Sequence, residues 1–337
     1  MSDVVGVSHT VAATPARSAK VSAISALLRS AAKEPAELEI VVAYLSGELR
    51  QRRTGVGWAA MRDLPQPVQT AELTVAEADA AFEHIANAAG AGSQAARAAE
   101  LRGLFAAATR VEQQFLQALA TGELRQGALD GVMADAIAKA AGVPVALVRQ
   151  AFMLRGSLPP VAVVALTGGA GGLNAIGLEI GRPLRPMLAQ SAPSVAEALA
   201  KVGGIAALEW KLDGIRVQIH RWAKENGTEV RVFTRTLDDI TARVPELVDA
   251  VAELGVRDVV VDGEAIALDE RGRPRPFQET AARTSSRLGV DALSRKIPLT
   301  VFVFDVLQLD GEPLLRAPAS RRQLLLETLL PQHLRVP

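Results

Sequence analysis

The sequence has no cysteine, no net charge and no long uninterrupted hydrophobic run. Among its 337 residues, 37 Lys and Arg balance 37 Asp and Glu, and 49% of the residues are hydrophobic. The absence of cysteine excludes disulfides, thiolate zinc sites, iron–sulfur clusters and cysteine nucleophiles. It also suits a reducing cytoplasm, which is the location we expect. Zero net charge excludes a protein that holds nucleic acid by bulk positive charge, but not one with local basic patches.

Two stretches decide what we expect about membranes. Residues 1–19 are polar and rich in Ala, Ser and Thr, without the apolar core of a secretory signal. The most apolar stretch, Leu158 to Ile180, is interrupted by Pro159, Pro160 and a run of glycines. A spanning helix needs about 20 nearly uninterrupted apolar residues. We therefore expect neither a secretory signal nor a membrane segment.

Residues 20–160 have the pattern of a helical domain. Apolar residues recur at spacings of three and four, alanine is abundant, and glycines stand between the segments as stop signals. Helices are predicted before and after Pro35 and around 75–89, 93–107, 109–120, 127–141 and 144–154. A glycine-rich stretch from Thr167 to Gly181 and two following prolines end the pattern. The prediction is an all-helical domain at 1–175 and a linker at 176–186.

After the linker, apolar residues alternate with period two, which is typical of strands. Strands are predicted at 206–212, 215–222, 229–234 and 299–309, with two shorter strands within 259–268. Asn226-Gly227 predicts a tight hairpin turn. Helices are predicted at about 240–254 and 320–330. Residues 187–337 are thus predicted to form an α+β domain with mostly antiparallel pairing.

One run in this second domain combines residue types that can carry chemistry: Glu209-Trp210-Lys211-Leu212-Asp213-Gly214-Ile215-Arg216. Lys211 ends one predicted strand and a glycine turn leads to the next, so we expect it in a partly buried hairpin mouth with Glu209 on the same face. Such a lysine loses its proton more easily than a free one and can be a nucleophile. An isolated Lys-x-Asp-Gly run, however, is more often a salt-bridged surface hairpin.

Three further positions accompany this run: Arg235 at a strand end, Glu264 after Asp262-Gly263, and Phe304 within an apolar strand. Together with Lys211 to Arg216, which match a KxDGxR nucleotide-attachment motif, they resemble the nucleotidyltransferase superfamily of ATP-dependent DNA ligases. In the helical half, Tyr44 to Trp58 resembles the DNA-binding domain of cellular and archaeal-type ligases. The alanine-rich composition indicates a bacterial member.

The resemblance implies a role for each position. Lys211 would attack the α-phosphate of ATP, expel pyrophosphate and hold AMP. Glu209 would read the adenine edge, and Phe304 would stack on the adenine face. Arg216 and Glu264 would contact the ribose, and Glu264 would also lie close to a catalytic Mg²⁺. AMP would then pass to the 5′-phosphate of a nick in duplex DNA, in repair, replication or recombination.

The resemblance also implies that the helical half holds duplex DNA by its backbone. A ligase joins nicks of any sequence, which needs phosphate contacts without base readout. The candidate DNA-binding residues are Arg50, Arg52, Arg53, Thr54 and Gly55. Arg235 would contact a phosphate of the nucleotide or of the nicked DNA. A solvated helix end is the alternative interpretation of this cluster. A second basic group could also touch DNA or be a solvated loop: Arg271, Arg273, Arg275, Arg283 and Arg287.

The later motifs of this family and its C-terminal OB-fold domain do not appear in the sequence. The resemblance therefore implies an incomplete ligase, expected to be a monomer, with a DNA-binding domain and the first part of an adenylation domain. A non-catalytic DNA-binding fragment and a related RNA ligase or capping-type enzyme stay open as alternatives. The helical half argues against the latter two, and the missing cysteines argue against a NAD-dependent ligase with its zinc site.

Two other features of the sequence indicate neither a phosphate-binding loop nor a metal site. Gly168 to Gly172 lacks the lysine of a phosphate-binding loop, and we expect a flexible linker there. The four histidines are scattered along the chain and indicate no metal cluster.

Overall fold

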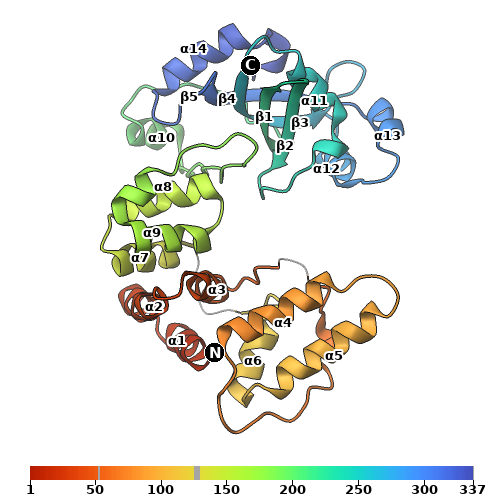
Figure 1. Cartoon of the computed structure of the whole chain (residues 1–337). Helices are drawn as coiled ribbons and strands as arrows, with labels where there is room; N and C mark the ends of the chain where they lie inside the picture. Colours follow the sequence, from red (N-terminus) through yellow and green to blue (C-terminus); the bar gives the residue numbers. More distant parts are fainter. Residues whose placement is uncertain (52–53, 125–129, 337) are drawn as a thin grey trace. The chain divides into compact units, whose positions relative to one another are not determined.

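The computed structural model describes residues 1–51, 54–124 and 130–336 (Figure 1). The chain divides into two compact units, Met1–Gly177 and Leu178–Pro337. In the described part of the chain, no helix is long and apolar enough to cross a membrane.

The described residues of the first unit fold mainly into helices, which confirms the helical prediction. The elements are α1 (Ser2–Ala13), α2 (Arg17–Ala31), α3 (Pro35–Leu45), the 3-10 turn η1 (Trp58–Met61), α4 (Val75–Asn87), α5 (Ser93–Ala106), α6 (Arg110–Ala120), α7 (Asp130–Ala141), α8 (Val145–Arg155) and α9 (Leu158–Asn174). Capping boxes start α4 and α6, where Thr74 and Thr109 pair with the glutamates three residues later. Helix α1 was not predicted, although Val4, Ser8 and Val11 are buried at helical spacing.

Helix α9 shows that the expected flexible linker at Gly168 to Gly172 is wrong. The helix runs through this glycine run and is kinked at Gly169, where φ is 56° and ψ is −149°. Beyond the kink, the chain comes back against the first part of the helix. A Cβ on Gly172 would lie 3.0 Å from Val164 Cγ1. The glycines therefore permit a sharp turn and a close approach of backbone, instead of providing a loose connection.

The second unit is built on one antiparallel sheet, with helices around it. Its strands are β1 (Ile215–Lys224), β2 (Gly227–Thr234), β3 (Asp258–Ala267), β4 (Leu299–Leu309) and β5 (Glu312–Pro313), in the order β2-β1-β3-β4-β5. Its helices are α10 (Val195–Lys201), η2 (Thr241–Arg243), α11 (Pro245–Ala252), α12 (Phe277–Ser285), α13 (Val290–Lys296), α14 (Ala319–Leu329) and η3 (Gln332–Leu334). The antiparallel pairing and the hairpin turn between β1 and β2 are confirmed.

Two strand predictions are wrong. Residues 259–268 form one strand, β3, instead of two, and the pairing with β4 shifts register between Asp262 and Gly263. Residues 206–212 form no strand, so the predicted hairpin between them and β1 is absent. The reason is that β1 already lies between β2 and β3, so both of its edges are occupied.

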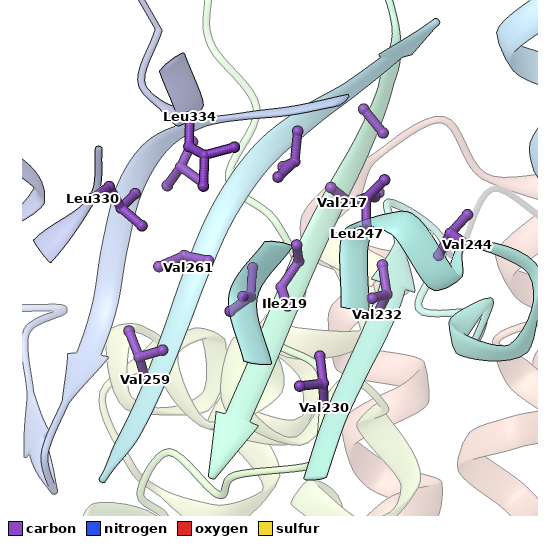
Figure 2. Packing of buried hydrophobic residues seen from close by; sticks show 14 of the residues in the cluster. Val217, Ile219, Val230, Val232, Val244, Leu247, Val259, Val261, Leu330 and Leu334 are labelled. Atoms are coloured by element: carbon purple, nitrogen blue, oxygen red, sulfur yellow. The ribbon is translucent and has the colours of Figure 1, made fainter. Parts of the chain in front are cut away.

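The hydrophobic core of the second unit lies on one face of the sheet. Figure 2 shows valine and isoleucine side chains of β1, β2 and β3 together with leucines from α11 and the C-terminal segment. Val217 and Ile219 of β1 are fully buried in this core. Because side chains alternate along a strand, Arg216, Gln218 and His220 are directed to the opposite face. That face carries the candidate site.

Candidate functional site

Arg216 lies at the centre of a group of predicted site residues. It faces Glu264 across the pairing of β1 with β3. Its guanidinium is 2.7 Å from the Asp262 carboxylate, 3.0 Å from the Met187 carbonyl oxygen and 5.4 Å from the centre of the Phe304 ring. The structure therefore brings Glu264 and Phe304, two of the candidate residues, close to Arg216.

Glu264 connects this group to the Lys-x-Asp-Gly run. Its Oε1 accepts a hydrogen bond from the Gly214 backbone N–H at 3.0 Å. Partial burial raises the pKa of Glu264, while this hydrogen bond and the charges of Lys211 and Arg216 act in the opposite direction.

Gly214 is required by the packing of this run against β3. A Cβ at this position would overlap the Ala265 carbonyl oxygen and would lie 2.6 Å from Ile266 Cγ1. Gly263 is similarly restricted, because a Cβ there would lie 2.9 Å from the Phe302 carbonyl oxygen. The two glycines of the Asp-Gly pairs therefore let the backbone pack closely at the site.

Lys211 and Glu209 are not held as expected. Both are exposed, in an irregular segment between α10 and β1, and Trp210 between them is 72% exposed. The prediction of a partly buried hairpin mouth is therefore wrong, for the same reason that residues 206–212 form no strand. The expected placement of Glu209 and Lys211 on one strand face is wrong for the same reason. Arg235 is exposed in the turn after β2, one residue beyond the pairing of Thr234 with Val217. This pairing puts it at the same end of the sheet as Arg216.

Two aspartates at the site were not singled out from the sequence. Asp262 is buried and binds Arg216, and burial raises its pKa more than this ion pair lowers it. Asp305 faces Asp262 across the sheet and is held by Arg322 of α14 through contacts of 2.6 and 3.1 Å. Both flank residues that were predicted, Glu264 and Phe304. Alternating charge on neighbouring strands was the signal that could have found them.

In the first unit, the structure places some of the candidate DNA-binding residues. Arg50 pairs with Asp79 of α4 at 2.7 Å, and 43% of its side chain stays exposed. Thr54 is buried, and Gly55 has a φ of 69°. Arg52 and Arg53 lie outside the described residues.

In the second unit, Arg283 is buried against Glu246 of α11, at 2.9 Å, so a solvated or DNA-contacting loop is wrong for this residue. Arg273 and Arg275 pair with Asp269 and Glu279. These pairs account for part of the second basic group.

An internal repeat in the first unit was also missed. Gly-Glu-Leu-Arg-Gln occurs at 47–51 and again at 122–126. Both copies follow a helix, α3 or α6, and both begin with a left-handed glycine, Gly47 at φ 77° and Gly122 at φ 72°. The glutamate N–H then bonds back into the helix, from Glu48 to Ala43 and from Glu123 to Ala118.

The two copies lie next to each other. A Cβ on Gly47 would be 3.6 Å from the carbonyl oxygen of Leu124. Two helix ends of the same sequence and the same capping thus meet on the first unit. Self-comparison of the sequence would have revealed them.

Comparisons with known proteins match both units of the chain to DNA ligase families. The family described as ATP dependent DNA ligase domain matches residues 186–336, and DNA ligase N terminus matches residues 59–138. A "Probable DNA ligase" of Mycolicibacterium paratuberculosis is 53% identical over 334 residues, covering 99% of this chain and 64% of the relative. Another, of Streptomyces griseus subsp. griseus, is 52% identical over 336 residues, covering 100% and 64%.

A solved structure named Pmar-Lig_Pre has a TM-score of 0.53 at 14% identity, over 96% of this chain and 62% of that one, and shows likeness of fold alone. The chain spans about 64% of the length of the curated relatives described above. The two family matches lie one in each unit, and the identity with the curated relatives extends across nearly the whole chain. The chain therefore belongs to the family of ATP-dependent DNA ligases.

Proposed function

We propose that this chain contributes the nucleotide-transfer chemistry of an ATP-dependent DNA ligase that seals nicks in duplex DNA. The observation that carries the proposal is the meeting of Arg216, Glu264 and Phe304 at the sheet end where Gly214 anchors the Lys211 run. Phe304 offers an aromatic face for the adenine, and Arg216 and Glu264 offer a cation and an acceptor for the ribose.

In the first step, the Lys211 amine in its neutral form attacks the α-phosphorus of ATP. The new nitrogen–phosphorus bond forms while the bond to the pyrophosphate oxygen breaks, and pyrophosphate leaves. The 5′-phosphate of the nick then displaces Lys211 from the AMP, and the 3′-hydroxyl finally displaces AMP. Because phosphoryl transfer depends on positioning and charge neutralisation, the cation Arg235 is suited to contact the phosphates, while Arg216 is suited to position the ribose.

Magnesium fits the carboxylate that is present. Mg²⁺ is usually held by one or two carboxylates together with substrate phosphates and waters, and not by an all-protein cage. Within the described residues, no cluster of three or more acidic or histidine side chains is arranged for a metal. Glu264, half-buried and fixed by Gly214, would be the carboxylate that holds the ion. The ion would neutralise charge on the phosphates.

The first unit would hold the duplex by phosphate contacts. The paired Gly-Glu-Leu-Arg copies put Arg50 at one helix end and Arg125 in the matching place in the sequence of the other. Arginines at equivalent places of a repeated sequence are suited to contact the phosphates of a duplex backbone, and neither needs base readout. Glu209 would read the adenine edge once the exposed segment closes on the nucleotide.

The exposure of residues 201–211 favours one alternative, a fragment that binds DNA without chemistry. Intact-protein mass after incubation with ATP and Mg²⁺ separates the two, with GTP and NAD⁺ in parallel. We expect one AMP adduct from ATP alone. It should be absent in Lys211→Ala and retained in the control Lys201→Ala, an exposed lysine at the end of α10.

An adduct from GTP would instead indicate a capping-type enzyme. No adduct from any nucleotide, with duplex binding retained, would support the non-catalytic fragment.

A further inference from the structure

A short segment lies across the outer face of β1. We call residues 181–187 the strap. Three alternate residues of β1 bind three positions of the strap in antiparallel order. His220 Nδ1 accepts from the Gly181 N–H at 3.0 Å, Gln218 Oε1 accepts from the Leu184 N–H at 2.7 Å, and Arg216 donates to the Met187 carbonyl at 3.0 Å.

His220 and Gln218 form one buried polar unit. Both side chains are buried, and His220 Nε2 lies 2.9 Å from Gln218 Oε1. Since Nδ1 accepts the Gly181 N–H, the ring proton sits on Nε2 and is donated to Gln218. The pair thus satisfies two strap N–H groups, of which that of Leu184 would otherwise be buried without a partner.

The strap could not be fixed in this register by apolar contact alone. Trp222, the next residue on the same face of β1, packs against Gly181, where a Cβ would lie 3.4 Å from the indole ring. Such packing is not directional, whereas hydrogen bonds to individual N–H groups select one register. Histidine and glutamine therefore determine where the strap ends, and hence where the Met187 carbonyl lies.

The far end of the strap reaches Arg216. This guanidinium has three neighbours: the Asp262 carboxylate, the Phe304 ring and the Met187 carbonyl. Asp262 and Phe304 belong to the sheet, but Met187 belongs to the strap. One of the contacts that orient Arg216 therefore depends on a segment held in place by Gln218 and His220.

We propose that Gln218 and His220 are positioning residues of the nucleotide site. We call this pair the latch, because it fixes the strap and so holds Arg216 in the orientation that receives ATP. This inference rests on the proposed function of Arg216 in nucleotide binding. It assigns a task to two buried residues that do not themselves reach the nucleotide. It also makes the segment that follows the boundary between the two units a part of the site.

The test uses the 337-residue protein with Gln218→Met and His220→Phe, which keep size but remove the acceptors. His220→Asn keeps an acceptor near the Nδ1 position. Ile219→Val is the control, because it weakens the same strand from the core face without touching the strap. Two readouts are taken: rotation of the Arg216 guanidinium by arginine-selective ¹⁵N NMR, and the KM for ATP in AMP-adduct formation.

We expect the Arg216 guanidinium to rotate faster in Gln218→Met and His220→Phe than in the wild type, and the KM for ATP to rise roughly fivefold, the value of one lost hydrogen bond. The rate at saturating ATP should stay unchanged. His220→Asn should recover part of the loss, and Ile219→Val should match the wild type. In an Arg216→Met background, Gln218→Met and His220→Phe should not raise the KM for ATP further, because they act through Arg216.

A restrained Arg216 with an unchanged KM in both latch variants would overturn the inference, and Gln218→Met alone decides if His220→Phe does not fold. If the wild type forms no adduct, the proposed function fails, and with it the assignment of the latch to a nucleotide site. The NMR readout then still decides separately whether the latch orients Arg216.

Discussion

His220 shows what complete burial does to a titratable side chain. Burial, with a smaller contribution from the charge of Arg231, lowers the pKa of His220 from 6.5 to about 3. In the unfolded chain the imidazole binds a proton near its ordinary pKa, whereas in the folded chain it stays neutral. Between these two values the unfolded state binds more protons, so stability falls as the pH drops below about 6.5.

This difference predicts an acid-sensitive second unit. Lowering the pH from 7.5 to 5 should reduce the free energy of unfolding by about 2 kcal/mol through His220 alone. Urea unfolding at both pH values measures the change, and His220→Asn should lose that part of the pH dependence. An equal decrease in the wild type and the variant would show that other groups are responsible.

At the scale of residues, the sequence singles out candidate site residues more readily than it predicts the contacts between them. Lys211, Arg216, Glu264 and Phe304 were singled out because each stands in a short run with a recognisable spacing. Asp262 was passed over, since its ion pair with Arg216 depends on how β1 and β3 align. The Met187 carbonyl could not be found at all, because a backbone oxygen carries no sequence signal.

At the scale of elements, one buried ion pair joins three parts of the second unit. Arg283 of α12 binds both oxygens of Glu246 of α11, at 2.9 and 3.0 Å, and Glu246 also accepts the Leu299 N–H at the start of β4. The Arg283 side chain is fully buried. Removing one partner would leave a buried charge without compensation, which is far more costly than losing a surface pair.

Glu246→Ala should therefore lower the free energy of unfolding by about 3–5 kcal/mol. The matched control is Glu312→Ala, which breaks the exposed pair with Arg321 and should change stability by less than about 1 kcal/mol. Thermal or urea unfolding of the two variants measures the difference. Equal small losses would mean that water or another cation compensates Arg283.

The elements themselves were predictable to different degrees. Helices α4 to α8 follow from local signals: capping residues, apolar spacing and terminal glycines. The strand expected at 206–212 had a strand-like pattern but no free edge of β1 to pair with. A local sequence pattern does not show whether a sheet edge is free. Helix α9 was missed because glycine is unfavourable in helices, yet at Gly172 the packing against Val164 requires it.

At the scale of the whole molecule, the proposal divides the work between two compact units. The first would bind duplex DNA and the second would react with ATP. The division could be expected from the switch from helical to alternating patterns. The pairing of the two Gly-Glu-Leu-Arg copies could not, because it depends on how α3 and α6 pack.

This division predicts separable defects. Arg50→Ala and Arg125→Ala should each weaken duplex binding a few-fold and reduce the slope of log affinity against log salt by about 1. AMP-adduct formation without DNA should continue. The control Arg17→Ala removes an exposed arginine paired with Asp135 and should leave binding unchanged. Salt titrations by fluorescence anisotropy measure all three, and equal losses in the control would refute a specific role for the repeat.

The close packing of Gly214 on β3 has a consequence for Lys211, three residues earlier in the chain. Three extended residues span at most about 11 Å, so the lysine backbone stays within that distance of Gly214. With about 6 Å added for the lysine side chain, one amine confined to a sphere of about 17 Å radius corresponds to a local concentration on the order of 0.1 M. The proposed nucleophile can therefore lie on an exposed segment and still be supplied to the site at high concentration, because the packing of Gly214 on the sheet fixes the chain three residues after it.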